Sequence, residues 1–362
     1  MSFLEQPTDR RTFLTRGAAV AAVPALAGVA SGVFAGSASA TASGVKAAGL
    51  DLPDYAPIPA SALGPALNSD GYYSGRIKNN LHWITDGTYQ AAFLLTREGV
   101  VLFDAPPTIG HNIQRAIDIA ARAAGMSNKV TYIVYSHHHA DHLGASFLFG
   151  KNVERIGHAQ NRALLLRDND PARPVPDHVF DDKMTLRVGG ERVELAHLGT
   201  NHTPDNIYIH FPDHDTLMLV DINLPGWVPF DSFNLNEDVQ GSIAAPTKAM
   251  AYPWSTFIGG HMGRLGNRAD MTTYMQYVDD LIAGARASLT NVDPTPFFAK
   301  YGDNAWAAVK NYQAAQVKYA ADPVIRKYTG VLAAADVYTE SNAFVLLEAI
   351  RLDLGVGSEV HA

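Results

Sequence analysis

Four histidines and one aspartate stand within six consecutive positions of this 362-residue chain, in the stretch YSHHHADHLG. His137 and His139 are two residues apart, so their rings fall on the same side of an extended chain, and Asp141 and His142 follow as the chain turns. Neutral imidazoles and a carboxylate are the ligands that zinc and other borderline divalent metals prefer. The pattern H-x-H-x-D-H therefore predicts a metal site rather than a chance meeting of core or surface histidines.

Three further candidate ligands each follow a strand-like run. They are His202 in LGTNHTPDN, Asp221 in LMLVDINLPG and His261 in FIGGHMGRLG. The chain has no cysteine, which excludes thiolate ligands, disulfides and cysteine nucleophiles, so nitrogen and oxygen must hold any metal. His138 points away from its neighbours in an extended chain, and we expect it to pack or to support the ligands.

Short strands alternating with helices must position these residues. Residues 81–105 predict three strands, broken at Asp86-Gly87 and Glu98-Gly99, and residues 112–125 predict a helix closed by glycine. The apolar run at 129–136 predicts a buried strand that ends at the histidine cluster, where ligands usually bind in α/β sheets. We expect hairpins at 184–199 and 206–222, a strand at 255–261, and helices from Arg268 onward.

Taken together, the motif and the three later residues resemble the pattern of the metallo-β-lactamase superfamily, over about half of the chain. The resemblance implies an α/β fold, a four-layer αββα sandwich with a two-metal site along one edge of the sheets, here followed by a C-terminal helical extension. It also implies a division of the ligands: His137, His139 and His202 on a first zinc, Asp141, His142 and His261 on a second, and Asp221 bridging the two.

This ligand set predicts a binuclear zinc-dependent hydrolase, although other divalent transition metals suit the same donors. Two dications can share a hydroxide at neutral pH and polarise a carbonyl, and Asp141 is the expected catalytic residue that orients this hydroxide. We expect an ester or lactone substrate, with a β-lactam or a glyoxalase-type thioester as alternatives. A non-catalytic metal-binding protein of the same fold is a further alternative, which the seven filled ligand positions argue against.

Aromatic residues after Asp221 indicate the character of the substrate. Trp227 and Phe230 lie close enough to reach the mouth of the site, although core packing is an alternative use of both rings. We therefore expect a small-molecule substrate that is neutral and fairly lipophilic. The formal net charge of −8 provides no basic surface for a nucleic acid.

The N-terminus is predicted to be a targeting segment. Arg10 and Arg11 precede an Ala/Val/Gly-rich stretch that ends near ASA at 38–40, which resembles a twin-arginine export signal. This stretch is weakly apolar for a stable membrane anchor. We expect a signal peptide at 1–40, an extended lead-in at 41–75, a metallo-β-lactamase-like domain at 76–267, a helical extension at 268–362, and export to the periplasm or the cell exterior.

Overall fold

The structure is a computed structural model that describes residues 52–353. The twin-arginine signal predicted for residues 1–40 lies outside these described residues, and so does the start of the predicted lead-in. The rest of the lead-in, up to residue 72, contains one 3-10 turn, η1 (Ala60–Ala62), and its residues are mostly exposed.

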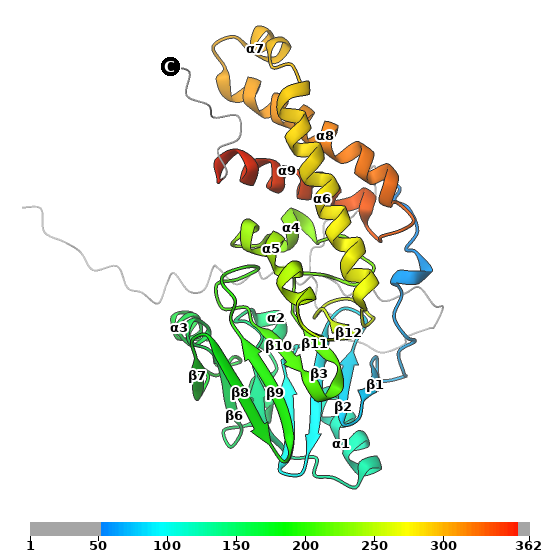
Figure 1. Ribbon diagram of the computed structural model, residues 1–362, viewed down its shortest axis with the longest axis vertical. Coiled ribbons are helices and arrows are strands. Elements are labelled where there is room, and N and C mark those ends of the chain that lie inside the picture. Colours follow the sequence, from blue (N-terminus) through cyan, green and yellow to red (C-terminus); the bar gives the residue numbers. More distant parts are fainter. Residues whose placement is uncertain (1–51, 354–362) are drawn as a thin grey trace, which may run out of the picture. The chain divides into compact units, whose positions relative to one another are not determined.

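The first sheet has seven strands in the order of the chain (Figure 1). Strands β1 to β4 pair antiparallel, whereas β4 to β7 pair parallel. The three strands predicted within residues 81–105 are present as β2, β3 and β4, and the predicted buried strand is β5. The bounds are β1 (Tyr73–Lys78), β2 (Leu81–Thr85), β3 (Gln90–Thr96), β4 (Gly99–Phe103), β5 (Val130–Val134), β6 (Glu154–His158) and β7 (His178–Phe180).

The second sheet has five strands in the order β12-β11-β10-β9-β8. Its antiparallel strands β8 to β11 include both predicted hairpins, and β12 adds parallel to β11. The bounds are β8 (Lys183–Val188), β9 (Glu191–Ala196), β10 (Tyr208–Phe211), β11 (Thr216–Met218) and β12 (Thr256–Ile258). The carboxyl ends of β9, β11 and β12 therefore lie at one edge of this sheet.

Three apolar cores separate four layers. Along β3, Phe93 faces a core with helix α1 (Asn112–Ala124), whereas its neighbour Leu94 faces a core between the two sheets, because successive strand residues alternate. A third core lies between the second sheet and the helices that follow it. The predicted αββα sandwich is thus confirmed. Helix α1 ends at Gly125, whose φ of 65° is the left-handed cap that the sequence predicted.

The remaining helices complete the outer layers. Helices α6, α8 and α9 contact one another, as Figure 1 shows in yellow, orange and red, and form the predicted C-terminal helical region. Helix α6 starts at a reciprocal capping box between Asn267 and Asp270. The bounds are α2 (Ala140–Leu143), α3 (Ala159–Asp168), α4 (Asp231–Leu235), α5 (Val239–Met250), α6 (Arg268–Asn291), α7 (Thr295–Tyr301), α8 (Ala305–Tyr328) and α9 (Ala335–Leu352).

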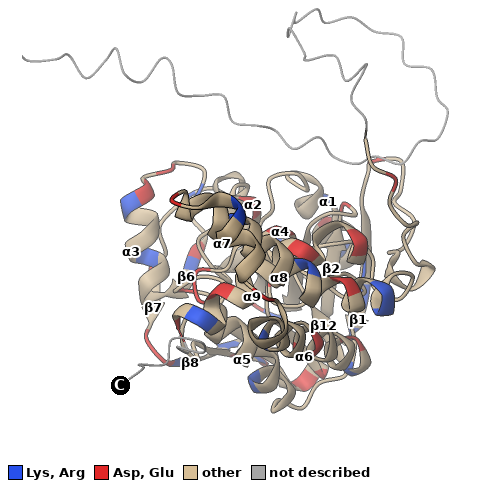
Figure 2. Ribbon diagram, turned by 90° about the horizontal axis from the view of Figure 1, so that it is seen from above, with Lys and Arg blue, Asp and Glu red and all other residues tan. Residues whose placement is uncertain are grey.

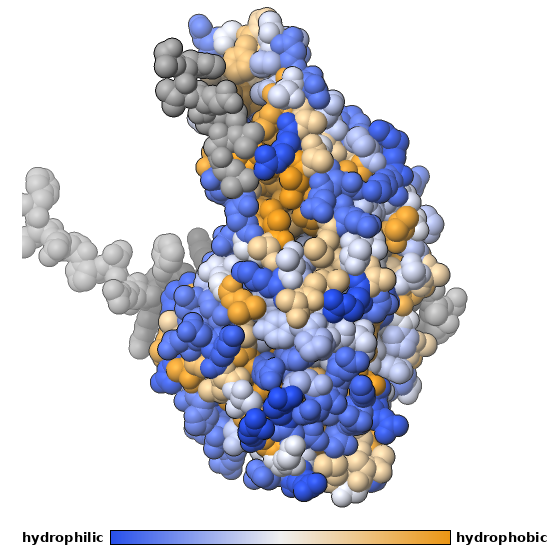
Figure 3. Space-filling model, viewed as in Figure 1, coloured by the Kyte–Doolittle hydropathy of each residue, from blue (hydrophilic) through white to orange (hydrophobic). Residues whose placement is uncertain are grey.

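The surface carries mixed charge and scattered apolar side chains. Figure 2 shows basic and acidic residues interspersed on the helices that face the viewer. In Figure 3, apolar side chains gather along the C-terminal helical region, where Trp306 and Phe344 are among the exposed large hydrophobic residues. Within residues 52–353, no helix combines the length and the apolar character that crossing a bilayer requires.

Candidate metal centre

All seven predicted ligands meet at the carboxyl ends of the strands. His137 and His139 follow β5, and the short helix α2 supplies Asp141 and His142. The second sheet supplies the other three, each from a loop just beyond a strand end: His202 after β9, Asp221 after β11 and His261 after β12. Residues far apart in the chain converge because both sheets present these ends at the same edge.

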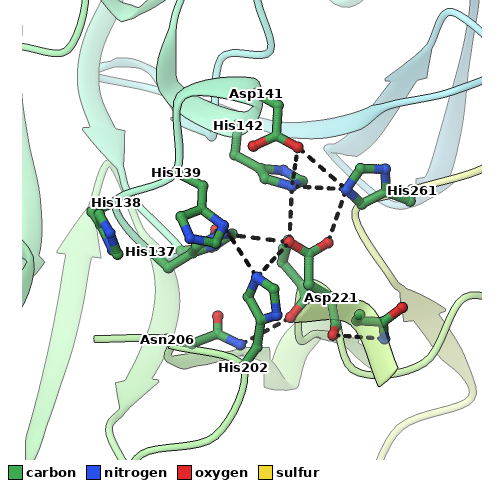
Figure 4. Close-up of polar contacts among 12 residues, drawn as sticks. His137, His138, His139, Asp141, His142, His202, Asn206, Asp221 and His261 are labelled. Carbon is green, nitrogen blue, oxygen red and sulfur yellow. Dashed lines mark hydrogen bonds and ion pairs between the residues drawn. The ribbon is translucent and has the colours of Figure 1, made fainter. Parts of the chain in front are cut away.

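The carboxylate of Asp221 lies at the centre of this cluster (Figure 4). Its Oδ2 atom is 3.1 Å from Nε2 of His142, 3.2 Å from Nε2 of His202 and 3.4 Å from Nε2 of His137. Its other oxygen, Oδ1, is 3.0 Å from Nε2 of His261. One carboxylate therefore contacts imidazoles from both halves of the cluster.

The seven candidate ligands form two groups that could each hold a metal ion, and a third group among the described residues combines His138 and His139 with Glu237. Asp221 joins the first group, and the second group contains Asp141, whose Oδ2 is 3.7 Å from Nε2 of His142 and 3.6 Å from Nε2 of His261. These groups correspond to the division that the resemblance implied, except that Asp221 falls in the first group alone, so its bridging role stays a prediction. The first group is His137, His139, His202 and Asp221, and the second is Asp141, His142 and His261.

The protonation states of two histidines suit metal binding. Burial, together with the nearby imidazoles, lowers the pKa of His137 well below its usual value. Burial also lowers the pKa of His139. Burial alone would raise the pKa of Asp221, but the imidazoles of His142, His261 and His202 hold it well below its usual range. Burial alone would lower the pKa of His142 and of His202, but Asp221 in turn raises the pKa of His142 to about 10 and raises that of His202, so binding of a metal would displace a proton from His142. Neutral imidazoles and an ionised carboxylate are the forms that coordinate a metal.

Three buried side-chain atoms of the candidate ligands have no hydrogen-bond partner: Nε2 of His137, Nδ1 of His142 and Oδ1 of Asp221. Those of His137 and Asp221 point into the group of donors (Figure 4). Buried polar atoms are nearly always satisfied, so orphaned atoms beside so many other donors indicate a further partner. The nitrogen and oxygen donors present fit a divalent cation.

One side of the cluster is open. The side chains of Asp141 and His261 are 40% and 21% exposed, whereas those of His137 and His142 are fully buried. Tyr89 lies at this side, with its ring centroid 4.7 Å from that of His261. Burial and the nearby Asp141 raise the pKa of Tyr89 to about 12, so its hydroxyl stays protonated at neutral pH. The partly exposed side chains of Asp141 and His261 are therefore accessible to a substrate.

Behind the ligands lies an aspartate that the sequence analysis missed. Asp104 directly follows β4, is fully buried, and accepts a hydrogen bond of 2.8 Å from the backbone N–H of Ser136. Its Oδ2 atom lies 4.0 Å from Nδ1 of His142, and burial raises the pKa of Asp104 to about 6. An acidic residue directly after a buried strand is the signal that identified Asp221, and it would have identified Asp104 also.

His138 faces away from the cluster, as predicted. Its Nδ1 atom lies 2.9 Å from Oδ1 of the buried Asp205, and its backbone carbonyl accepts a hydrogen bond of 2.6 Å from Arg173. Asn161 donates to the other oxygen of Asp205 at 2.8 Å. His138 therefore fixes the loop between its two neighbours through contacts outside the donor set.

The two predicted aromatic residues lie in different surroundings. Phe230 is 49% exposed, and its ring packs edge-on against Tyr338 of α9 at 5.0 Å. Trp227 is partly buried, and its indole N–H donates to the carbonyl of Ala62 at 3.3 Å. The substrate contact of both rings stays a prediction.

Known proteins provide an independent comparison. The family model described as the metallo-beta-lactamase superfamily matches residues 85–261. The chain is 29% identical to metallo-beta-lactamase IND-1 of Chryseobacterium indologenes over 151 residues. This aligned region covers 39% of this chain and 60% of that protein. The chain is 22% identical over 218 residues to the 2,4-dinitroanisole O-demethylase subunit alpha of Nocardioides sp. (strain JS1661), which covers 59% of this chain and 62% of that protein. The chain thus spans about three fifths of the length of these relatives.

Solved structures are similar over a comparable part of the chain. The structure of metallo-beta-lactamase IND-7 aligns with a TM-score of 0.47 at 22% identity, covering 57% of this chain and 99% of that one. The metallo-beta-lactamase from Pontibacter korlensis aligns with a TM-score of 0.44 at 18% identity, covering 57% and 97%. Residues 85–261 are thus similar to the metallo-beta-lactamase superfamily, and this segment contains all seven candidate ligands.

Proposed function

We propose that this protein is a hydrolase that holds two divalent ions, zinc by the chemistry of its donors, and cleaves a carboxylic ester or a lactone. The observation that carries the proposal is the central position of Asp221, which lies within 3.4 Å of imidazoles from both donor groups. His137, His139 and His202 would hold one ion, Asp141, His142 and His261 the other, and Asp221 both.

Bound divalent ions supply an activated water as nucleophile and polarise the carbonyl of the substrate. The chain supplies the geometry. The carboxylate of Asp141, on the open side, is placed to accept a hydrogen bond from the attacking water and to orient it. The protonated hydroxyl of Tyr89 lies at the same side and can donate to a substrate oxygen. The buried walls around His137 and His142 exclude bulk water from the far side.

The proposed substrate is neutral and lipophilic. Phe230 immediately precedes α4 and Leu235 is its last residue, and their side chains are 49% and 61% exposed. Exposed apolar side chains beside a polar centre suit an acyl chain or ring better than a charged group. The names of the relatives add a β-lactam and an aryl methyl ether as alternative substrates.

A substrate panel tests the proposal. The purified, zinc-supplemented protein is assayed against chromogenic esters, lactones, thioesters, a cephalosporin and 2,4-dinitroanisole, with Asp221→Asn as the matched control. We expect turnover of an ester or lactone, and a loss of more than about 100-fold in the isosteric variant, since even residues behind metal ligands are worth 10–100-fold. Absence of turnover throughout, or equal turnover by Asp221→Asn, would overturn the proposal.

A further inference from the structure

Gln90, the first residue of β3, is fully buried and lies outside the donor set, yet its side chain reaches the loop that carries His261. Its amide nitrogen lies 3.2, 2.6 and 2.8 Å from the carbonyl oxygens of His261, Met262 and Arg264. Its backbone N–H donates to the carbonyl of Gly260 at 2.8 Å. One residue therefore lies within hydrogen-bonding distance of four backbone carbonyls of this loop, three of which share the two N–H groups of its amide.

The His261 loop depends on such support. It has no regular secondary structure between β12 and α6, and Met262 adopts a left-handed φ of 62°, which a residue with a side chain rarely does. A second contact, from the N–H of Met262 to the carbonyl of Thr88 at 2.7 Å, comes from the same neighbouring segment. Without the side-chain amide at position 90, the converging carbonyls would lose the two N–H donors that they share.

The contacts of Gln90 are confined to one donor group. His261 belongs to the second group, whose other members, Asp141 and His142, come from α2. The first group has a separate support, because the side-chain oxygen of Asn236 lies 3.0 Å from Nδ1 of His202. Gln90 thus contacts the backbone of one ligand of the second group and hydrogen-bonds to no ligand of the first.

We propose that Gln90 is a positioning residue that sets the metal affinity of the second donor group through the backbone of His261. The inference rests on the proposed function in that both groups bind metal. Replacing a residue that only stabilises the fold would lower the zinc affinity of both donor groups together, or of neither. The zinc affinity of one group relative to the other therefore distinguishes a positioning role from a structural role.

The test is a two-step zinc titration of the full chain in competition with a chromophoric chelator. Gln90→Met keeps the length of the side chain and removes its donor. We expect the affinity for one equivalent to fall by about 10–100-fold, the usual effect of losing a residue behind a metal ligand, and the affinity for the other to stay within about twofold. His261→Ala is the benchmark and should weaken the same equivalent.

Thr96→Val is the matched control. Thr96 ends the same strand, is buried, and donates to the carbonyl of Gly99 at 2.7 Å, but it contacts no residue of the donor set. The Thr96→Val variant should bind both equivalents of zinc with wild-type affinity. If Gln90→Met fails to fold, Gln90→Asn, which keeps the amide but withdraws it by one methylene, should show the same selective loss.

Two outcomes would overturn the role of Gln90: native affinity for both equivalents in the folded variant, or equal weakening of both. The wild-type titration distinguishes these failures from a failure of the proposed function. A wild-type protein that binds no zinc contradicts the metal centre itself, whatever the variants do.

Discussion

Neighbouring histidines of one motif have different partners in this protein. The ring of His139 lies against His202, with Nδ1 3.1 Å from Nε2, whereas the ring of His138 lies against Asp205. The alternation expected for an extended chain thus holds through the cluster. The two side chains are chemically identical, so their positions alone predict different consequences of the same substitution.

His139→Ala should lower kcat/KM by more than about 100-fold and reduce the bound metal, because it removes a donor of the first group. His138→Ala should keep its metal and stay within about tenfold of wild-type turnover. It should instead lose about 3 kcal/mol of unfolding free energy, because Asp205 is left buried without its histidine. Elemental analysis, kinetics and denaturant unfolding measure the three quantities. Equal loss of metal in both variants would contradict the alternation.

The sequence predicted the candidate ligands better than it predicted the residues that hold the ligand loops in place. Each candidate ligand follows a strand-like run or belongs to a dense motif, which is a local signal. Gln90 and Asp205 carry no such signal, because their partners lie 171 and 67 positions away in the chain. Only the pairing of the strands brings these residues beside the loops that they hold.

At the scale of elements, the turn at α4 is the part of the fold that local sequence rules could not predict. Residues 232–235 all have left-handed φ angles between 52° and 61°, although none is glycine. Each such residue costs about 1–2 kcal/mol relative to a right-handed turn. Partners in α9 stabilise the turn: Asn342 accepts from the N–H of Phe233 at 2.7 Å, and Ser341 from that of Ser232 at 3.2 Å.

This turn also touches the metal centre. The side-chain amide of Asn234 donates to the backbone carbonyl of Asp221 at 3.1 Å, and its oxygen accepts from the N–H of Phe230 at 2.7 Å. Asn234 therefore links the backbone at Phe230 to the backbone of Asp221, which is the reason to expect the ring of Phe230 at the substrate.

Phe230→Ala should lower kcat/KM for the best lipophilic substrate by about tenfold or more, since an aromatic contact of this kind is worth on the order of 1.5–3 kcal/mol, and should leave bound metal unchanged. Phe298→Ala is the matched control, because Phe298 on α7 is 43% exposed but lies outside this turn. Kinetics on both variants give the comparison. Equal kcat/KM in the two would show that the ring of Phe230 only packs against Tyr338.

At the scale of the whole molecule, the C-terminal helices share a core with the second sheet. Leu217 and Phe257 of the sheet and Met271 and Tyr277 of α6 are all buried in one cluster. The sequence analysis identified a helical region after Arg268, but patterns within a helix do not reveal which surface it covers. The shared core means that this region is a layer of the fold.

A chain that ends at residue 267 should therefore fail to fold cooperatively. Truncation would expose the outer face of the second sheet, and each large apolar side chain is worth about 1.5–3 kcal/mol when buried, against a total stability of about 5–15 kcal/mol. Circular dichroism during thermal unfolding tests this outcome. A sharp two-state transition of the truncated chain would contradict it.

The twin-arginine signal stays a prediction, since residues 1–51 are outside the described structure. Arg10 and Arg11 are its distinguishing residues, and the absence of cysteine means that no oxidative folding is needed after export. Replacing both with lysine should leave the uncleaved protein in the cytoplasm, as cell fractionation would measure. Normal export of this variant would contradict the signal.

The metal content of the purified protein tests the central claim most directly. Seven nitrogen and oxygen donors form two groups joined at Asp221, so elemental analysis of protein purified without chelator should find about two equivalents of divalent transition metal per chain. His137→Ala and His261→Ala, one from each group, should each lower this value toward one. A reproducible value near zero in a folded protein would contradict the account.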